Sequence, residues 1–317
     1  MSINSLKHHI INGETMGTRY CANFCAGEKV DINALNDALF AAVDNVDQQM
    51  STWKPESDLM KINSAKLNVW LPLKPELCQV LDCAFQISKT SQGAFDIGVG
   101  GLVNAWGFGA TGRELDVDRV KQQLNKSQPI ATDCFELNVE YQKIRKTRPC
   151  IIDLSGIAKG FAVDQMIGVF KSFGVENALA SLDGELCAIG VEADGRSWNI
   201  ALEKPDYEKR DAIGVIALDN SAVATSGDYR HWIDVGDKKL SHSMNPKSGG
   251  PVQNNIASVS VIAQSCMLAD AWATTLMVMG EVNGSEFAKA HDMNTLFILR
   301  KHDELMQKAY GDVFTDI

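Results

Sequence analysis

The chain has 317 residues, of which 45% are hydrophobic and 22% are charged, so it has the composition of a folded globular protein with one large domain or two modest ones. Its formal net charge of −10 argues against a broad nucleic-acid surface, because tracking a phosphate backbone needs an excess of Lys and Arg. No apolar run reaches the roughly 18 residues of a transmembrane helix, so we expect no membrane span in this chain.

The first half of the chain predicts a strand pair, two helices and a long loop. Apolar residues recur at helical spacing in both helical segments. Long glycine-rich loops usually have a functional role. In chain order, the predicted elements are a pair of short strands within 7–25, a helix at 31–50, a polar loop at 51–58, a helix at 76–92 and a glycine-rich loop at 93–112.

The second half mixes strands and helices without the regular βαβ repeat of a doubly wound sheet, so we expect an α+β fold. Its predicted elements are strands near 147–154 and 177–190 with a helix at about 156–173 between them, strands at 197–203, 213–218 and 256–263, an apolar helix at 267–280 and a closing strand near 295–300.

The segment from Cys150 to Asp164 runs from an apolar strand through a turn into a helix. Asp153 ends the strand, and Ser155 is placed to cap the helix. A helix N-terminus presents free N–H groups and the positive end of the dipole, so this turn suits an anion, and Lys159 could meet a phosphate or a carboxylate. A capped helix with a surface lysine explains the same pattern about equally well.

Asp270 is the only charged residue of the apolar stretch 267–280. A lone buried carboxylate is costly, so it needs water, a hydrogen-bond donor or a metal. Thr274 follows one helical turn later on the same face, and magnesium prefers such oxygen ligands. The alternative is a carboxylate favoured by the helix dipole and a threonine bonded to its own helix, and this segment alone slightly favours that alternative.

His242 lies beside an Asn-Pro turn and a glycine pair, where a histidine can act as a base near neutral pH. Most isolated loop histidines are surface residues, so the position alone is a weak signal. Trp53 and Trp106 also lie in predicted loops and could stack on a planar ring, although packing explains each of them alone.

Eight short segments, spread in order over about residues 10–300, together resemble the ApbE family of FAD:protein FMN transferases. They are Glu-Thr-Met-Gly-Thr (14–18), Ser-Thr-Trp-Lys-Pro-Glu-Ser-Asp-Leu (51–59), Gly-Ala-Phe-Asp-Ile (93–97), Leu-Val-Asn-Ala-Trp-Gly-Phe-Gly (102–109), Ile-Asp-Leu-Ser-Gly-Ile-Ala-Lys-Gly (152–160), Ala-Thr-Ser-Gly-Asp-Tyr (224–229), the loop around His242 and Ala-Asp-Ala-Trp-Ala-Thr (269–274). The resemblance implies an ApbE-like, T-fold-like α+β fold of mixed sheets and helices. It also implies a single domain at 5–312, with two lobes and the flavin cleft between them.

The resemblance further implies a magnesium-dependent enzyme that moves FMN from FAD to a threonine hydroxyl of a partner flavoprotein and releases AMP. FAD is then a substrate and Mg²⁺ the cofactor. The alternatives are a magnesium-dependent FAD pyrophosphatase, which makes FMN and AMP, and a flavin-binding protein without turnover.

Site residues are carried over by the same resemblance. FAD contacts fall on Met16, Trp53, Ala94, Phe95, Asp96, Asp153, Lys159 and Met244. Magnesium is expected on Asp270, Thr274 and the backbone carbonyl of Gly156, and His242 matches the histidine that activates the acceptor.

Two positions depart from the family pattern. Many relatives have Asp-Pro where this chain has Asn245-Pro246, and some have an acidic residue where it has Ala273. Both changes remove negative charge, so we expect a lower metal affinity or an additional water ligand.

The eight cysteines have neither zinc-ribbon spacing nor the density of a disulfide scaffold, which favours free thiols in a reducing compartment. The first residues lack the apolar core of a signal peptide. The sequence as given therefore predicts a cytoplasmic protein. A leader removed from it would point instead to a periplasmic protein or an inner-membrane lipoprotein.

Overall fold

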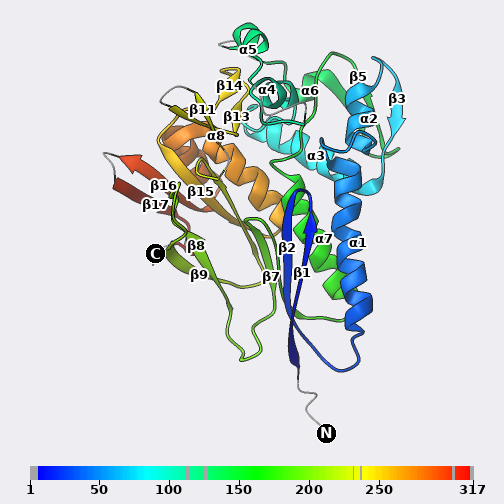
Figure 1. The fold of residues 1–317 in the computed structure, drawn as a ribbon, viewed down its shortest axis with the longest axis vertical. Coiled ribbons are helices and arrows are strands. Elements are labelled where there is room, and N and C mark those ends of the chain that lie inside the picture. The colour runs from blue at the N-terminus through cyan, green and yellow to red at the C-terminus, as the bar shows by residue number, and fades with distance from the viewer. Residues whose placement is uncertain are drawn as a thin grey trace.

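One antiparallel sheet organises the computed structural model, which describes residues 6–110, 115–124, 128–230, 232–235, 238–301 and 304–314. Within these ranges, the strand order across the sheet is β1-β2-β6-β7-β10-β15-β16-β17 (Figure 1). The strands are β1 (Lys7–Thr15), β2 (Thr18–Ala26), β6 (Asn177–Leu182), β7 (Glu185–Ile189), β10 (Ala222–Gly227), β15 (Ile256–Ala263), β16 (Asn294–Lys301) and β17 (Glu304–Tyr310).

The predicted strand pair at the N-terminus is confirmed as the β1–β2 hairpin. Thr15 pairs with Thr18, and the two residues between them, Met16 and Gly17, have φ angles of 49° and 71°. Two successive positive φ values match the twist of a tight hairpin turn. Glycine adopts this conformation freely, whereas Met16 adopts it at some cost in strain.

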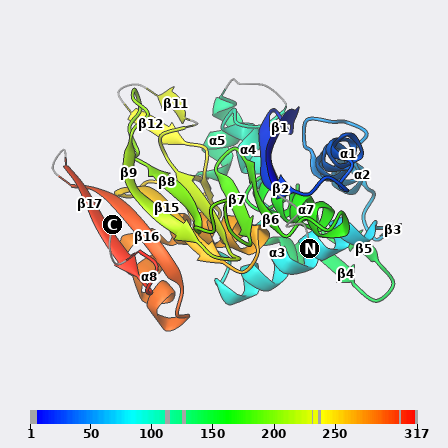
Figure 2. The same cartoon turned by 90° about the horizontal axis from the view of Figure 1, so that it is seen from below.

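Three long helices pack on one face of the sheet (Figures 1 and 2). They are α1 (Ile32–Met50), α7 (Ala158–Ser172) and α8 (Cys266–Ala290), and α7 packs between the other two. The side chain of Asp31 caps α1 by accepting hydrogen bonds from two backbone N–H groups. All three helices were predicted, and α8 continues beyond the predicted end at Gly280, where φ is 80° and ψ is 173° and the helix is interrupted.

The C-terminal half of the sheet is buried on both faces. Val259 of β15 and Phe297 of β16 pack towards α8, whereas Ala257 and Ile298 pack towards a hairpin on the other face. That hairpin consists of β8 (Trp198–Glu203) and β9 (Ala212–Leu218). Alternation along β16, and along β15 after a register shift between Ile256 and Ser258, therefore fixes which side of the sheet α8 occupies.

The shorter elements gather at one end of the sheet and its helices (Figure 1). There, Leu102, Trp106, Val120, Leu240 and Met244 form a small core of their own. This separate core supports the expected two lobes, while the boundaries of a domain at 5–312 stay a prediction. The elements are α2 (Asp58–Ser64), β3 (Trp70–Pro72), α3 (Pro75–Thr90), α4 (Gly100–Ala105), α5 (Val117–Gln123), α6 (Ala131–Cys134), β4 (Phe135–Asn138), β5 (Lys143–Lys146), β11 (Trp232–Val235), β12 (Lys238–Ser241), β13 (Met244–Asn245) and β14 (Gly250–Pro251).

Two strand predictions were wrong. Within 147–154 only Ile151 makes a bridge, a parallel one to Val99. Pro149 lacks an N–H group for strand pairing, and Ile152 and Leu154 are buried in a loop. The segment 177–190 is two strands, β6 and β7, which turn at Asp183 with a φ of 61°. Neither β10 nor the edge strand β17 was predicted.

Candidate active site

The helices α7 and α8 touch at Gly160. A Cβ atom added to Gly160 would lie 2.3 Å from the carbonyl oxygen of Cys266 and 2.9 Å from the Cβ of Asp270. The N–H group of Gly160 donates a hydrogen bond of 3.0 Å to Oδ2 of Asp270. Glycine at this position therefore brings the start of α7 within hydrogen-bonding reach of the carboxylate on α8.

The carboxylate of Asp270 is buried, with 4% of the residue exposed. Burial raises its pKa to about 8, and the negative charge of Glu185 acts in the same direction. Lys159 and the N–H group of Gly160 oppose this rise. The surroundings thus leave the negative charge of Asp270 undercompensated, and a bound cation would stabilise the charged form.

Thr274 lies one turn after Asp270. The turn before α7 and the strand β10 both approach its side chain, and Phe95 approaches the same turn. A Cβ atom added to Gly156 would lie 3.2 Å from Oγ1 of Thr274 and 3.5 Å from Cε2 of Phe95. The hydroxyl of Ser226, on β10, is 3.0 Å from the hydroxyl of Thr274. The structure therefore gathers the three residues predicted to hold the metal, and it adds Ser226, which was not predicted.

The donor atoms of this cluster are all oxygen. They comprise the carboxylate of Asp270 and the hydroxyls of Thr274 and Ser226, and the family resemblance adds the backbone carbonyl of Gly156 as an expected donor. Among the described residues, no group of three or more His, Cys, Asp or Glu side chains could hold a metal ion. Such a set suits Mg²⁺, which takes oxygen ligands and keeps water or phosphate in its other positions. It does not suit a structural zinc ion, which takes four protein ligands.

The two departures from the family pattern have different surroundings. Ala273 is fully buried in the apolar cluster between α8 and the sheet, and its effect on metal affinity stays a prediction. Asn245 closes its own turn, because its Oδ1 accepts a hydrogen bond of 2.9 Å from the N–H group of Lys247.

Lys159 belongs to a network with two carboxylates of the β6–β7 turn. Its Nζ lies 2.8 Å from Oε1 of Glu185 and 3.3 Å from Oδ2 of Asp183. Burial alone would lower the pKa of Lys159, but Glu185, Asp270 and Asp183 outweigh burial and raise it. Lys159 is therefore a permanent cation beside Asp270. Glu185 was not predicted to lie near the site, because a single strand was predicted over 177–190. The Asp183-Gly184 pair is nevertheless a typical hairpin-turn signal.

The predicted helix cap at Ser155 was wrong. The helix α7 begins at Ala158, and its N-cap residue, Ile157, makes no side-chain cap hydrogen bond. Instead, Oδ1 of Asp153 accepts hydrogen bonds from the Ser155 hydroxyl and, at 2.8 Å, from the Ser155 N–H group. The turn that precedes α7 is therefore closed by Asp153, which is itself 7% exposed.

The predicted flavin segment 94–96 is a buried loop that follows α3. The carboxylate of Asp96 accepts hydrogen bonds of 2.7 Å from the N–H group of Gly98 and 3.0 Å from that of Ala131. Burial raises the pKa of Asp96, and these two donors oppose the rise. The side chain of Asp96 thus holds the loop in shape, while Phe95 reaches Gly156.

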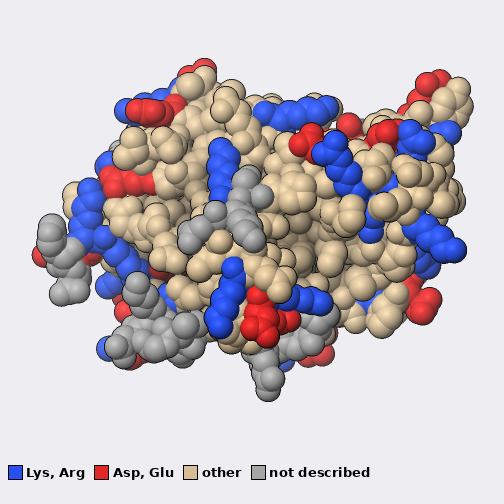
Figure 3. All heavy atoms as spheres, turned by 90° about the horizontal axis from the view of Figure 1, so that it is seen from above, with Lys and Arg blue, Asp and Glu red and all other residues tan. Residues whose placement is uncertain are grey.

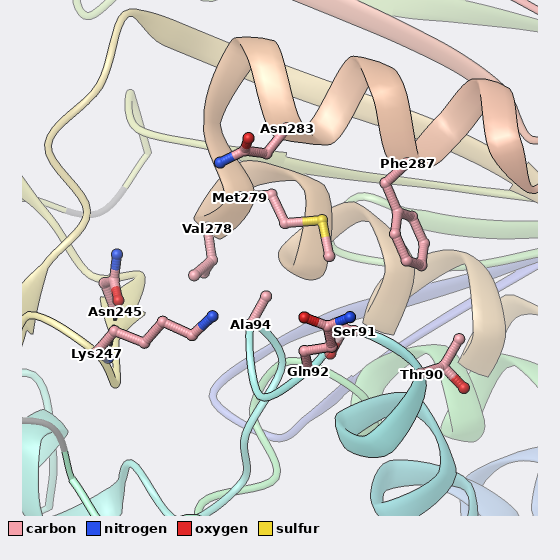
Figure 4. A pocket seen from close by; sticks show the side chains of 10 residues that line it. All are labelled: Thr90, Ser91, Gln92, Ala94, Asn245, Lys247, Val278, Met279, Asn283 and Phe287. Carbon is pink, nitrogen blue, oxygen red and sulfur yellow. Dashed lines mark hydrogen bonds between the residues drawn. The ribbon is translucent and has the colours of Figure 1, made fainter.

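A pocket of about 450 Å³ opens beside this loop, between the end of α3, the β13–β14 hairpin and α8 (Figure 4). Val278 lies in its wall, one helical turn beyond Thr274, so the pocket adjoins the oxygen cluster along α8. Among the described residues of its lining, Lys247 is the only charged one, and its side chain extends towards Ala94 in Figure 4. The lining residues are Thr90, Ser91, Gln92, Ala94, Asn245, Lys247, Val278, Met279, Asn283 and Phe287.

The remaining predicted residues lie on other elements, and their contacts with FAD stay a prediction. His242 is half-buried between β12 and β13, with its ring centroid 6.4 Å from that of Phe108, and Met244 packs in the small core. Met16 lies in the β1–β2 turn, and Trp53 follows α1 with 61% of the residue exposed.

A family comparison decides what kind of protein this geometry belongs to. The ApbE family model matches residues 16–297. The chain belongs to the ApbE family. The ApbE resemblance inferred from the eight segments is thereby confirmed.

Individual ApbE relatives agree with the family match. A protein from Vibrio cholerae named FAD:protein FMN transferase is 35% identical over 301 residues, which cover 94% of this chain and 90% of the relative. A protein of the same name from Escherichia coli strain K12 is 30% identical, over 93% of this chain and 85% of its own.

Solved ApbE structures share the fold. The flavin transferase ApbE from Vibrio cholerae superposes with a TM-score of 0.86 and 31% identity, over 96% of this chain and 97% of its own. The apo flavinyl transferase ApbE from Pseudomonas stutzeri gives a TM-score of 0.85 and 28% identity, over 98% and 96%. The expected ApbE-like α+β fold is confirmed. Among the described residues, no helix has both the length and the apolar character needed to cross a membrane.

Proposed function

We propose that this ApbE protein is a magnesium-dependent FAD:protein FMN transferase, which moves the FMN half of FAD to a threonine hydroxyl of a partner flavoprotein and releases AMP. The observation that carries the proposal is the oxygen cluster of Asp270, Thr274 and Gly156 at the α7–α8 crossing, beside the cation Lys159. The names of the relatives support the same activity.

In this proposal, the oxygens of Asp270, Thr274 and Gly156 hold the metal ion. When bound, Mg²⁺ would neutralise the pyrophosphate of FAD and stabilise charge on the leaving AMP. Asp153 keeps the turn before α7 closed, and Lys159 supplies a fixed positive charge near the phosphates. Met16, Trp53 and the loop of Ala94, Phe95 and Asp96 contact the rest of the dinucleotide, together with Met244.

His242 is proposed as the general base. The threonine oxygen of the acceptor attacks the phosphorus of the FMN half, the bond from that phosphorus to the bridging oxygen breaks, and AMP leaves with that oxygen. A ring nitrogen of His242 takes the proton from the threonine. Replacing the threonine by water gives the pyrophosphatase reaction, so the two candidate functions differ only in the acceptor.

The net charge of the chain is −10, but the described surface at this end carries charges of both signs (Figure 3). Figure 3 shows Lys and Arg side chains spread over the face seen from above, together with several groups of Asp and Glu.

The test is transfer itself. Incubating the protein with FAD, Mg²⁺ and an acceptor flavoprotein should add the mass of FMN to one threonine and release AMP, as measured by mass spectrometry. A valine in place of that threonine is the matched control on the acceptor. AMP release without acceptor labelling would indicate the pyrophosphatase, and FAD binding without AMP would indicate a protein that only binds flavin.

His242→Ala should slow transfer by roughly 10²–10⁴-fold, the usual contribution of a general base, with FAD affinity nearly unchanged. Single-turnover transfer and flavin-fluorescence titration would measure the two effects separately. Transfer by the variant at the wild-type rate would remove His242 from the mechanism.

A further inference from the structure

The connection between β8 and β9 is a closed loop that carries Tyr207. The N–H group of Lys204 donates a hydrogen bond of 2.8 Å to the carbonyl oxygen of Asp211, which closes the base of the loop. Within the loop, Oδ1 of Asp206 accepts hydrogen bonds of 2.8 Å and 3.1 Å from the N–H groups of the second and third residues after it. The backbone on both sides of Tyr207 is therefore held in a defined shape.

The hydroxyl of Tyr207 ties this loop to β10. It donates a hydrogen bond of 3.1 Å to Oδ2 of Asp228, the residue that follows β10. Arg300, on β16, holds the same carboxylate, since its Nη2 donates to Oδ1 at 2.8 Å, and its Nη1 donates to the carbonyl oxygen of Pro205 at 3.2 Å. Asp228 lies two residues after Ser226, whose hydroxyl meets the oxygen cluster. Tyr207 is thereby fixed to the strand that reaches the proposed metal site.

The ring of Tyr207 contacts the β11–β12 hairpin. Its centroid lies 5.3 Å from that of Trp232 in an edge-to-face arrangement, and Nζ of Lys239 lies 4.4 Å from the Trp232 centroid and 5.4 Å from the Tyr207 centroid. Edge-to-face rings attract each other, and a cation beside their faces adds to the attraction. Trp232 pairs across the hairpin with Ser241, which directly precedes His242. The contact therefore reaches the backbone that carries the proposed base.

The position of this hairpin depends on side-chain contacts. Within the described ranges, β11 and β12 pair with each other rather than with the main sheet, so no strand pairing sets their distance from β10. Leu240 anchors the hairpin in the small core, and Tyr207 holds it from the side of β10 and β16. The distance between His242 and the oxygen cluster therefore depends on Tyr207.

We propose that Tyr207 is a positioning residue for FMN transfer, which fixes the β11–β12 hairpin, and with it His242, relative to the oxygen cluster on α8. This inference rests on the proposed function, in which His242 takes the proton of the acceptor threonine. Tyr207 acts in it through the hairpin, without contact to FAD or to the acceptor. A misplacement of about 1 Å can cost a reaction roughly 10²-fold in rate, so loss of the Tyr207 ring should slow transfer although every reacting group is still present.

The experiment compares wild type, Tyr207→Leu and Tyr207→Phe in single-turnover FMN transfer to an acceptor flavoprotein at saturating FAD and Mg²⁺. Tyr207→Leu should slow the transfer step roughly 10- to 100-fold, with the affinity for FAD nearly unchanged. Tyr207→Phe should transfer at nearly the wild-type rate, because its ring can still pack on Trp232 and Arg300 still holds Asp228. Hydrogen exchange of the amides of β11 and β12 should be faster in Tyr207→Leu than in the other two proteins.

Tyr310→Leu is the matched control for loss of a tyrosine ring. Tyr310, on β17, is also half-buried, with its ring centroid 5.9 Å from that of Phe297 and 5.2 Å from Nζ of Lys289. It should neither slow transfer nor speed exchange in the β11–β12 hairpin. In a His242→Ala background, Tyr207→Leu should add little further loss, because the base that it positions is already missing.

Equal transfer rates in Tyr207→Leu and Tyr310→Leu would overturn the proposal, and so would an equally large further loss in the His242→Ala background. Unchanged exchange of the hairpin amides in Tyr207→Leu would also overturn it. A wild-type protein that labels no acceptor would overturn the proposed function itself, and this inference would fall with it. The hydrogen-exchange measurement would still show whether Tyr207 fixes the hairpin, so the two failures are distinguishable.

Discussion

At the scale of single residues, the site depends on one costly feature, a carboxylate that the protein buries without a full counter-charge. Asp270 receives one backbone hydrogen bond, from Gly160, and its pKa rises to about 8 because of burial and the charge of Glu185. In an apolar helix such a residue opposes folding in its charged form. The proposed metal ion would offset this cost, so we propose that Asp270 serves a ligand rather than stability.

The first prediction concerns the pH dependence of Asp270. Its pKa in the folded protein, about 8, lies above the ordinary value of 3.8, so the metal-free protein takes up a proton on folding between these pH values. The free energy of unfolding should therefore fall as the pH rises through that window, by about 2 kcal/mol between pH 6 and pH 8. Denaturant unfolding with a chelator present would measure it.

Asp270→Asn should be nearly free of this loss above pH 6 and should no longer be stabilised by Mg²⁺. Asp164, whose pKa burial raises to about 6, accounts for the slope that remains below that pH. Equal slopes for wild type and variant between pH 6 and pH 8 would show that Asp270 is ionised at neutral pH without a metal.

A second residue-scale prediction concerns Ser226, whose hydroxyl lies 3.0 Å from that of Thr274. Ser226→Ala removes one hydrogen bond that orients a proposed metal ligand, so the Mg²⁺ concentration for half-maximal activity should rise roughly 2- to 10-fold. Magnesium titration of turnover would measure it. Ser260→Ala is the matched control, because Ser260 on β15 makes a 2.7 Å hydroxyl pair with Thr225, the neighbour of Ser226 on β10. Ser260→Ala should leave the titration unchanged.

At the scale of elements, the geometry of the proposed site depends on the crossing of α7 and α8. Two contacts fix it: Gly160 against Cys266 and Asp270, and Asp164, whose carboxylate accepts hydrogen bonds of 2.7 and 2.9 Å from the first N–H groups of α8. The first contact positions the proposed metal ligand and the second caps the helix that carries it. A change in the spacing of the two helices therefore alters stability and chemistry together.

The third prediction tests this crossing with two glycines of one helix. Gly160→Ala places a Cβ atom 2.3 Å from the carbonyl oxygen of Cys266, so α7 and α8 must separate, and we expect a loss of about 1–3 kcal/mol in the free energy of unfolding. Gly168→Ala meets nothing within 4 Å and should stabilise α7 by about 0.5–1 kcal/mol. Urea unfolding would compare them, and similar effects of the two changes would contradict the close contact.

The elements also show which parts of the fold could be read from the sequence. Periodicity located α1 and α3, because each buries an apolar stripe against the rest of the core. The overall apolar character of 267–280, rather than its periodicity, indicated the first part of α8. Apolar patterning failed at 147–154, where Ile152 and Leu154 are buried in a loop, and at β10, whose sequence Ala-Val-Ala-Thr-Ser-Gly has few large apolar side chains. Burial and strand pairing are different properties, and periodicity reports mainly the first.

At the scale of the whole molecule, the candidate site is assembled from segments that are distant in sequence. Helical spacing alone predicts that Asp270 and Thr274 lie on one face of α8. Gly156, Ser226 and Glu185 come close to that face only through the strand order β6-β7-β10-β15 and the packing of α7 on α8. The family motifs pointed to Gly156 by resemblance. Ser226 lies in the family segment 224–229 and Glu185 follows the Asp183-Gly184 turn pair, but neither signal assigns the residue a role, so the folded chain is needed to place them beside Thr274 and Lys159.

The fourth prediction follows from the extent of the site. The oxygen cluster, the Lys159 network and the adjoining pocket offer contacts to both halves of a dinucleotide, so FAD should bind much more tightly than FMN or riboflavin. Flavin-fluorescence titration of the three ligands would measure it. Equal affinities for FAD and FMN would contradict the proposed placement of the pyrophosphate and favour a protein that binds only the flavin half.

The interruption of α8 at Gly280 separates two tasks along one helix. Asp270, Thr274 and Val278 follow one another at intervals of four residues and share one face of the helix. At Gly280 the positive φ of 80° breaks the helical repeat, so the faces of the two helical parts are not in register. Asn283 and Phe287 therefore line the pocket from a separately oriented segment. A substitution or insertion after residue 280 can therefore reshape the pocket without rotating Asp270 or Thr274 out of place. This modularity would let selection, or a designer, change which molecule the pocket accepts while the reaction centre stays the same.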